Sequence, residues 1–171
     1  MKKRILLTSI SAAVVVVAAG VGFRAFADQR DRGVALRAEL RGLNEVPPTT
    51  SRGSASLRAT LDEDAQTISF TIDFRDLTAN PTVAHIHFGP TKVNGGVMVF
   101  FCGGGGKPAC PPAPATITGT WVAADVLGPA AQGIAAGEFA ESLAAMRNGL
   151  SYANIHTDKH PGGEIRGPVR R

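Results

Sequence analysis

The sequence predicts an all-β fold, an antiparallel β-sandwich of Greek-key type with one short helix near residues 135–148. Several segments alternate apolar and polar side chains with the period of two that is typical of half-buried strands. The 171 residues include 20 glycines and 11 prolines, so the chain must turn often. Short strands separated by such turns indicate a sandwich or a small barrel rather than a helical bundle.

Three strands are predicted in the first half of the domain, over residues 34–41, 53–61 and 67–74. The alternation is clearest in the third of these strands. Between the first two, Pro47 and Pro48 supply no backbone N–H and must interrupt pairing. Residues 61–67 are predicted to form the tip of a hairpin.

Further strands are predicted near residues 82–88, 96–101, 115–122, 150–157 and 163–168. The helix near 135–148 differs from them in its period, because Phe139, Leu143 and Met146 are spaced at i, i+4 and i+7. We expect these three side chains to pack against the core. Gly149 stands where a helix commonly ends in a glycine with a left-handed backbone.

Residues 1–27 have the features of an export signal. Three basic residues at positions 2–4 precede a long uncharged apolar run, and the small-x-small site at 25–27 predicts cleavage after Ala27. An uncleaved membrane anchor is the alternative, since residues 5–23 are long enough to span a bilayer. We expect a cleaved signal, a flexible charged segment over 28–33, and a single domain over 34–171 in a secreted or periplasmic protein.

The positive charge of the chain lies largely in this signal. The whole sequence has a formal net charge of +4, but residues 1–27 hold four basic and no acidic residues, so the remainder is formally neutral. Nucleic-acid binding requires clustered Lys and Arg to displace counterions. We therefore expect no nucleic-acid partner, and no membrane contact once the signal is removed.

The chain contains two cysteines, Cys102 and Cys110. In an exported protein two such cysteines are expected to form a disulfide. A metal or redox thiol pair is the alternative, but the spacing differs from C-x-x-C. The run of glycines between them is not a phosphate-binding loop, because Lys107 is followed by Pro108 rather than by Ser or Thr.

His85 and His87 are the first candidates for a functional site. Along this strand Ala84, Ile86 and Phe88 share one face, and the two histidines share the other. Their Cα atoms would lie about 6–7 Å apart, which is compatible with two ligands on one metal ion. Two histidines on the surface, or packed under a loop, are the plain alternative.

A second histidine strand repeats this arrangement. If Ile155 pairs with Ile165 and both face the core, the polar residues of the hairpin lie on the outer face. The outer pairs are then His156 with Glu164 and Asn154 with Arg166. His156 becomes a third candidate ligand and Glu164 a carboxylate that orients it, or the pairs are plain polar contacts. His160, in the turn beside Pro161, is expected to be solvent-exposed.

Three linked motifs, the last of them in two segments, resemble the chordin-type (CHRD) domain. They are LNEVPP at 43–48, AHIH at 84–87, YANIHT at 152–157 and PGGEIRG at 161–167. The resemblance extends over about residues 34–169 and adds Glu45 to Asn154, Glu164 and Arg166 as residues of interest. It implies an extracellular β domain. The binding of bone morphogenetic proteins by animal chordin is not transferred, because this chain lacks chordin's cysteine-rich repeats.

A second likeness is local. Residues 84–89 (AHIHFG) are similar to the strand of copper-zinc superoxide dismutases whose H-x-H supplies copper ligands, and a sandwich of superoxide dismutase or immunoglobulin type agrees with this. The bridging histidine and the zinc loop of those enzymes have no counterpart in the sequence.

Three functional hypotheses follow. The first is a non-catalytic extracellular module that binds an unknown ligand. The second is a protein that binds copper or zinc through His85, His87 and His156. The third is a metalloenzyme at the same residues, which would need an open coordination position and a substrate pocket. The sequence favours the first, with which the second is compatible.

Overall fold

The computed structural model describes residues 33–171. The predicted export signal over 1–27 and its cleavage point lie outside the described residues, as does the segment 28–32. Within the described part of the chain, no helix is both long and apolar enough to cross a membrane.

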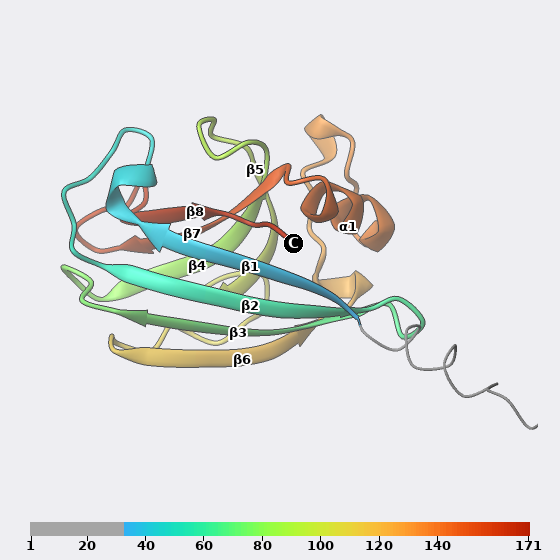
Figure 1. The fold of residues 1–171 in the computed structure, drawn as a ribbon, viewed down its shortest axis with the longest axis horizontal. Helices are drawn as coiled ribbons and strands as arrows, with labels where there is room; N and C mark the ends of the chain where they lie inside the picture. The colour runs from blue at the N-terminus through green and yellow to red at the C-terminus, as the bar shows by residue number, and fades with distance from the viewer. Residues whose placement is uncertain (1–32) are drawn as a thin grey trace, which may run out of the picture. The chain divides into compact units, whose positions relative to one another are not determined.

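The described residues form eight strands and one α-helix (Figure 1). The elements are β1 (Val34–Arg41), β2 (Ser54–Asp62), β3 (Thr67–Arg75), β4 (Pro81–Phe88), β5 (Gly96–Cys102), β6 (Ala115–Trp121), α1 (Phe139–Arg147), β7 (Ser151–Thr157) and β8 (Ile165–Pro168). Every predicted strand is present. The all-β antiparallel class with a single short helix is confirmed.

All eight strands belong to one hydrogen-bonded sheet in the order β5-β4-β7-β8-β1-β2-β3-β6. The sheet curls on itself into a nearly closed barrel, and Figure 1 shows β1 and β2 in front of β4. One half of the sheet consists of β5, β4, β7 and β8, and the other half consists of β1, β2, β3 and β6. The two halves join where β8 meets β1, at the pair Arg41–Arg166 and the isolated bridge Arg37–Arg170. Because this join is narrow, the two halves face each other like the layers of a sandwich.

The two edge strands approach each other at the opening of the barrel. The indole Nε1 of Trp121, at the end of β6, donates a hydrogen bond of 2.8 Å to the carbonyl oxygen of Phe100 in β5. The indole ring also stacks on Phe70 at 4.2 Å and packs against Phe101 at 4.9 Å between ring centroids. Trp121 therefore ties the last strand of the order to the first.

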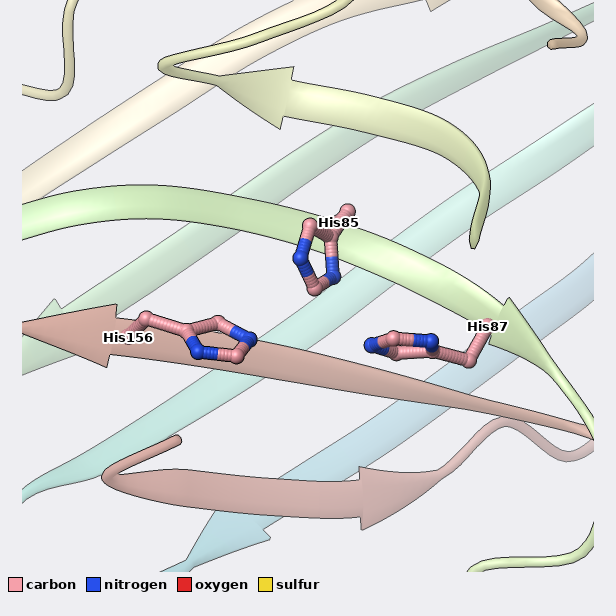
Figure 2. Close-up of side chains that lie close together, drawn as sticks. All are labelled: His85, His87 and His156. Carbon is pink, nitrogen blue, oxygen red and sulfur yellow. The ribbon is translucent and has the colours of Figure 1, made fainter. Parts of the chain in front are cut away.

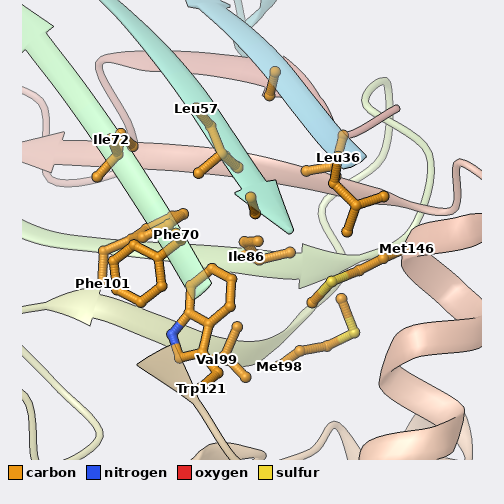
Figure 3. Close-up of a cluster of buried hydrophobic side chains, with 14 of the residues drawn as sticks. Leu36, Leu57, Phe70, Ile72, Ile86, Met98, Val99, Phe101, Trp121 and Met146 are labelled. Carbon is orange, nitrogen blue, oxygen red and sulfur yellow. The ribbon is translucent and has the colours of Figure 1, made fainter. Parts of the chain in front are cut away.

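The core fills the space between the halves (Figure 3). The apolar faces of β1, β2 and β3 supply aliphatic side chains together with Phe70 and Phe74, and β4 and β5 supply Ile86, Met98 and Val99 from the opposite side. Burying a side chain of this size contributes about 1.5–3 kcal/mol relative to leaving it in water. This packing fixes which face of β4 points inward, and so fixes the face that carries the histidines.

Helix α1 covers one end of the core. Its apolar residues Phe139, Leu143 and Met146 are all buried, as predicted, and Met146 points toward Met98 in Figure 3. Gly149 follows the helix with a φ of 68°, and its N–H donates to the carbonyl of Met146. The helix thus ends with the left-handed glycine that the sequence indicated.

Cys102 and Cys110 form the predicted disulfide. It closes a loop at the end of β5 with a sequence separation of 8 residues. The loop approaches the barrel closely, since a Cβ atom at Gly104 would lie 2.4 Å from the Phe100 ring. Only glycine allows this packing of the loop on the Phe100 ring.

Replacing both cysteines with alanine should lower the free energy of unfolding by about 2–3 kcal/mol, because a loop of this length gains chain entropy in the unfolded state. Urea denaturation followed by Trp121 fluorescence measures the change. Cys102→Ala and Cys110→Ala alone should each have nearly the full effect, since either one breaks the same bond. Single effects that add up to the double effect would contradict this account.

Candidate metal centre

The site begins with the pairing of two neighbouring strands, β4 and β7. They run antiparallel, with His85 opposite Asn154 and His87 opposite Tyr152. Ile86 and Ile155 face the core, with 1% and 0% of their surface exposed. Because side chains alternate along a strand, the histidines of both strands lie on the other face of the sheet.

This pairing gathers the three predicted histidines into one cluster (Figure 2). Ring centroids lie 4.4 Å apart for His85 and His87, and 4.8 Å apart for His85 and His156. One ring nitrogen from each residue lies within 4.8 Å of the other two. Figure 2 shows the rings of His87 and His156 pointing toward each other, with the ring of His85 above the gap between them.

The cluster is covered, although the sequence placed it on an outer face. His85 is only 5% exposed, and His87 and His156 are half-buried. The ring of Phe100 packs edge-on against His85 at 5.2 Å. On the same face Tyr152 is 0% and Asn154 is 1% exposed, so this face of β7 is fully buried up to the half-buried His156.

Two backbone carbonyls orient the flanking histidines. The carbonyl oxygen of Gly95 lies 2.8 Å from Nδ1 of His87, and that of Pro161 lies 2.8 Å from Nδ1 of His156. A carbonyl only accepts hydrogen bonds, so Nδ1 carries the proton in both neutral rings. The lone pair of each ring is therefore at Nε2, as in metal-ligating histidines held by a second partner.

Three buried ring nitrogens remain without a hydrogen-bond partner within residues 33–171. They are Nδ1 of His85, Nε2 of His87 and Nε2 of His156. A buried polar atom without a partner costs about 1–3 kcal/mol, and such atoms are rare in folded proteins. Three of them in one cluster form a set of donors suited to one metal ion.

The cluster is uncharged at neutral pH. Burial lowers the pKa of His85 to about 2, and the nearby His87, His156 and Arg166 act in the same direction. Burial also lowers the pKa of His87 to about 4, against the opposing hydrogen bond to Gly95. The pKa of His156 is lowered for the same reason. Neutral imidazole is the form that binds transition metals.

Glu164 does not orient His156, and that expectation was wrong. The regular pairing of β7 with β8 ends at Ile155–Ile165, and Gly163 just before has a φ of 123°. Glu164 therefore leaves the strand alternation, and its carboxylate accepts hydrogen bonds from Thr157, Ser51 and Thr78. Burial raises the pKa of this carboxyl group, but these hydrogen bonds outweigh burial and hold the pKa below its usual range.

The other predicted residues form a polar cluster beside the histidines. Asn154 pairs with Arg166 in register, as predicted, and its amide donates to the Glu45 carboxylate and to the Ile165 carbonyl. Nε of Arg166 lies 3.1 Å from Oε2 of Glu45, and both side chains are almost fully buried. Burial raises the pKa of Glu45, and Arg166 offsets part of that rise.

Gly163 allows this cluster to close. A Cβ atom there would lie 2.8 Å from the Glu45 carboxylate and 2.9 Å from the Asn154 amide. His160 lies in the same turn, is half-buried rather than exposed, and stands outside the histidine cluster.

The sequence does not identify Tyr152 as part of the site. Its fully buried ring stacks on His87 with 4.6 Å between centroids and 16° between planes. Nor does the sequence identify Gly95 and Pro161, whose carbonyls fix two of the rings. Strand alternation does indicate the position of Tyr152, because residues 152, 154 and 156 share one face.

The comparisons with known proteins agree with the resemblance in the motifs. The family model of the CHRD domain matches residues 36–169, essentially the whole described fold. Searches of curated proteins and of solved structures found no significant match. This match covers β1 from Leu36 onward, all the other strands, the helix and the candidate ligands, and the chain therefore belongs to the CHRD domain family.

Proposed function

We propose that this CHRD domain binds one transition-metal ion, copper or zinc, through His85, His87 and His156. The observation that carries the proposal is the convergence of three buried ring nitrogens that have no other partner within the described residues. A chance cluster of histidines gives no reason for two of the rings to be held by carbonyls with their lone pairs directed inward.

The donor set favours copper and zinc over harder ions. Imidazole nitrogen suits zinc, copper, iron and nickel, whereas calcium and magnesium prefer oxygen ligands. A zinc ion bound at 2.0–2.1 Å needs ring nitrogens about 3–3.5 Å apart. The ligand nitrogens lie within 4.8 Å of one another, so the rings would draw closer together around a bound ion.

Three protein ligands leave a coordination position for water or for a ligand from outside. This reconciles the two leading hypotheses from the sequence, because an extracellular binding module can hold its ligand through a bound metal. The proposal concerns binding and includes no reaction.

We further propose that the protein acts outside the cytoplasm. The Cys102–Cys110 disulfide supports this, because structural disulfides persist in oxidising compartments. The signal-like sequence over 1–27 is the second support.

Expression in a bacterial host should yield an exported protein whose N-terminus is Asp28. Intact-mass measurement of the periplasmic or medium fraction tests this. A variant with Lys2, Lys3 and Arg4 changed to Glu is the matched control and should remain unexported, because the positive n-region is needed for recognition. Recovery of the exported protein with Met1 still attached would contradict the proposed cleavage.

Purified protein without a histidine tag should bind about one Cu²⁺ or Zn²⁺ per chain. His85→Ala should weaken binding at least about 100-fold, because losing a ligand costs no less than losing a residue that orients one. Calorimetric titration measures the affinity, and circular dichroism checks the fold. His160→Ala is the matched control and should bind like the wild type; equal affinity in His85→Ala and wild type would overturn the proposed ligand set.

The metal-free protein should lose stability as the pH falls below about 6.5. The pKa of His85 is lowered in the fold to about 2, so the unfolded chain takes up its proton first and acid favours unfolding. This residue alone should cost about 1.4 kcal/mol per pH unit between pH 6 and 4. Urea denaturation in EDTA should show that the free energy of unfolding falls less steeply with decreasing pH in His85→Phe than in the wild type, by about 1.4 kcal/mol per pH unit. Equal slopes for the two proteins would show that His85 is not held neutral.

A further inference from the structure

The orientation of His87 depends on the segment that joins β4 to β5, residues 89–95. The carbonyl of Gly95 at its end holds Nδ1 of His87. Most of this segment is exposed, including Asn94 and Val93, and it contains glycine at both ends. Such a segment is mobile unless other contacts fix it, so the position of the Gly95 carbonyl depends on contacts from outside the segment.

Arg166 donates hydrogen bonds to three acceptors in this segment. Its Nη1 donates to the carbonyl oxygens of Thr91 at 3.2 Å and Val93 at 3.4 Å, and its Nη2 donates to Oδ1 of Asn94 at 2.8 Å. The side chain is 2% exposed, and Glu45 balances its charge. A planar guanidinium can serve several acceptors at once in a fixed geometry, which a flexible ammonium cannot do.

Tyr152 connects the same cation to the histidine itself. The guanidinium carbon of Arg166 lies 4.3 Å from the centroid of the Tyr152 ring, and the same ring stacks on His87. The Tyr152 hydroxyl accepts a hydrogen bond of 3.1 Å from the Gly95 N–H. Both backbone polar groups of Gly95 are therefore hydrogen-bonded: its N–H donates to the Tyr152 hydroxyl, and its carbonyl accepts from His87.

We infer that Arg166 is a positioning residue for His87: it fixes segment 89–95 and the Tyr152 ring, and thereby the tautomer and direction of the His87 ring. The inference rests on the proposed function for its purpose, but its geometry stands on contacts of the protein alone. With this role, the buried ion pair of Arg166 with Glu45 does more than hold β8 against the rest of the sheet. Residues that orient a ligand in this way typically change metal affinity about 10–100-fold when mutated.

Arg166→Lys and Asn94→Ala test this inference. The lysine keeps the charge that pairs with Glu45 but loses the planar fork, and Asn94→Ala removes one acceptor from an exposed position where folding is not at risk. Arg58→Lys is the matched control, because Arg58 makes an exposed ion pair with Asp73 on another strand pair. Nitrogen-15 NMR of the metal-free proteins reports which ring nitrogen of His87 carries the proton.

Wild type and Arg58→Lys should show His87 as a single tautomer protonated at Nδ1, and both test variants should show a mixture of tautomers. In a titration with Cu²⁺ alone, Arg166→Lys should bind about 10-fold more weakly or worse, with an altered electron paramagnetic resonance spectrum. Asn94→Ala should change both readouts in the same direction and less strongly.

An unchanged His87 tautomer in both test variants would overturn the inference, even if Cu²⁺ binds. A wild type that binds no Cu²⁺ would instead overturn the proposed function, while the tautomer measurement would still decide the role of Arg166. If Arg166→Lys does not fold, the tautomer of His87 in Asn94→Ala decides the question alone.

Discussion

The antiparallel register of β4 against β7 is the constraint on which the candidate site depends. It sets His85 opposite Asn154 and His87 opposite Tyr152, and it places His156 next to both on the same face. A shift of one residue would move all of these side chains to the other face of the sheet. The isoleucines of both strands hold the register, because they are buried in the core and cannot exchange places with histidines without a large cost.

Much of the polar face of these strands and of the adjacent β8 is buried, including His85, Asn154 and Arg166. Burying an arginine and a carboxylate takes both from water, and removing one partner of such a pair typically costs about 3–5 kcal/mol. An ion pair of this kind adds little net stability, so its presence in a small domain calls for another explanation. Here the polar layer holds loop segments against the sheet and gives the histidines a rigid surrounding, which a solvated face would not provide.

Much of the fold was predictable because it depends on local alternation. The period of two located the strands, and the i, i+4, i+7 spacing of Phe139, Leu143 and Met146 located the helix. The same parity placed His85, His87 and His156 on faces away from the core. Parity gives the face of a side chain but not its depth, so the burial of these histidines could not be read from it.

The errors and omissions arose where the chain leaves regular strands. The alternation predicts Glu164 opposite His156 only if the β7–β8 register continues, but the register ends one residue earlier, at Ile155–Ile165. Gly95 and Pro161 act through backbone carbonyls, which carry no mark in the sequence. Arg166 was identified as a residue of interest, but its contacts with residues 91–94 depend on how that segment folds back over the sheet.

The meeting of the two edge strands has a consequence for how copies of the domain behave together. An open sheet edge presents a row of unpaired N–H and C=O groups on which a strand of another molecule can dock. In this fold the edges formed by β5 and β6 turn toward each other, where Trp121 bonds to the Phe100 carbonyl. The disulfide loop after β5 lies beside the same opening, where Lys107 and Pro108 line a pocket together with Thr118 of β6. The curled sheet thus shields its own edges, and this protects the domain against the edge-to-edge association with which β-aggregation begins.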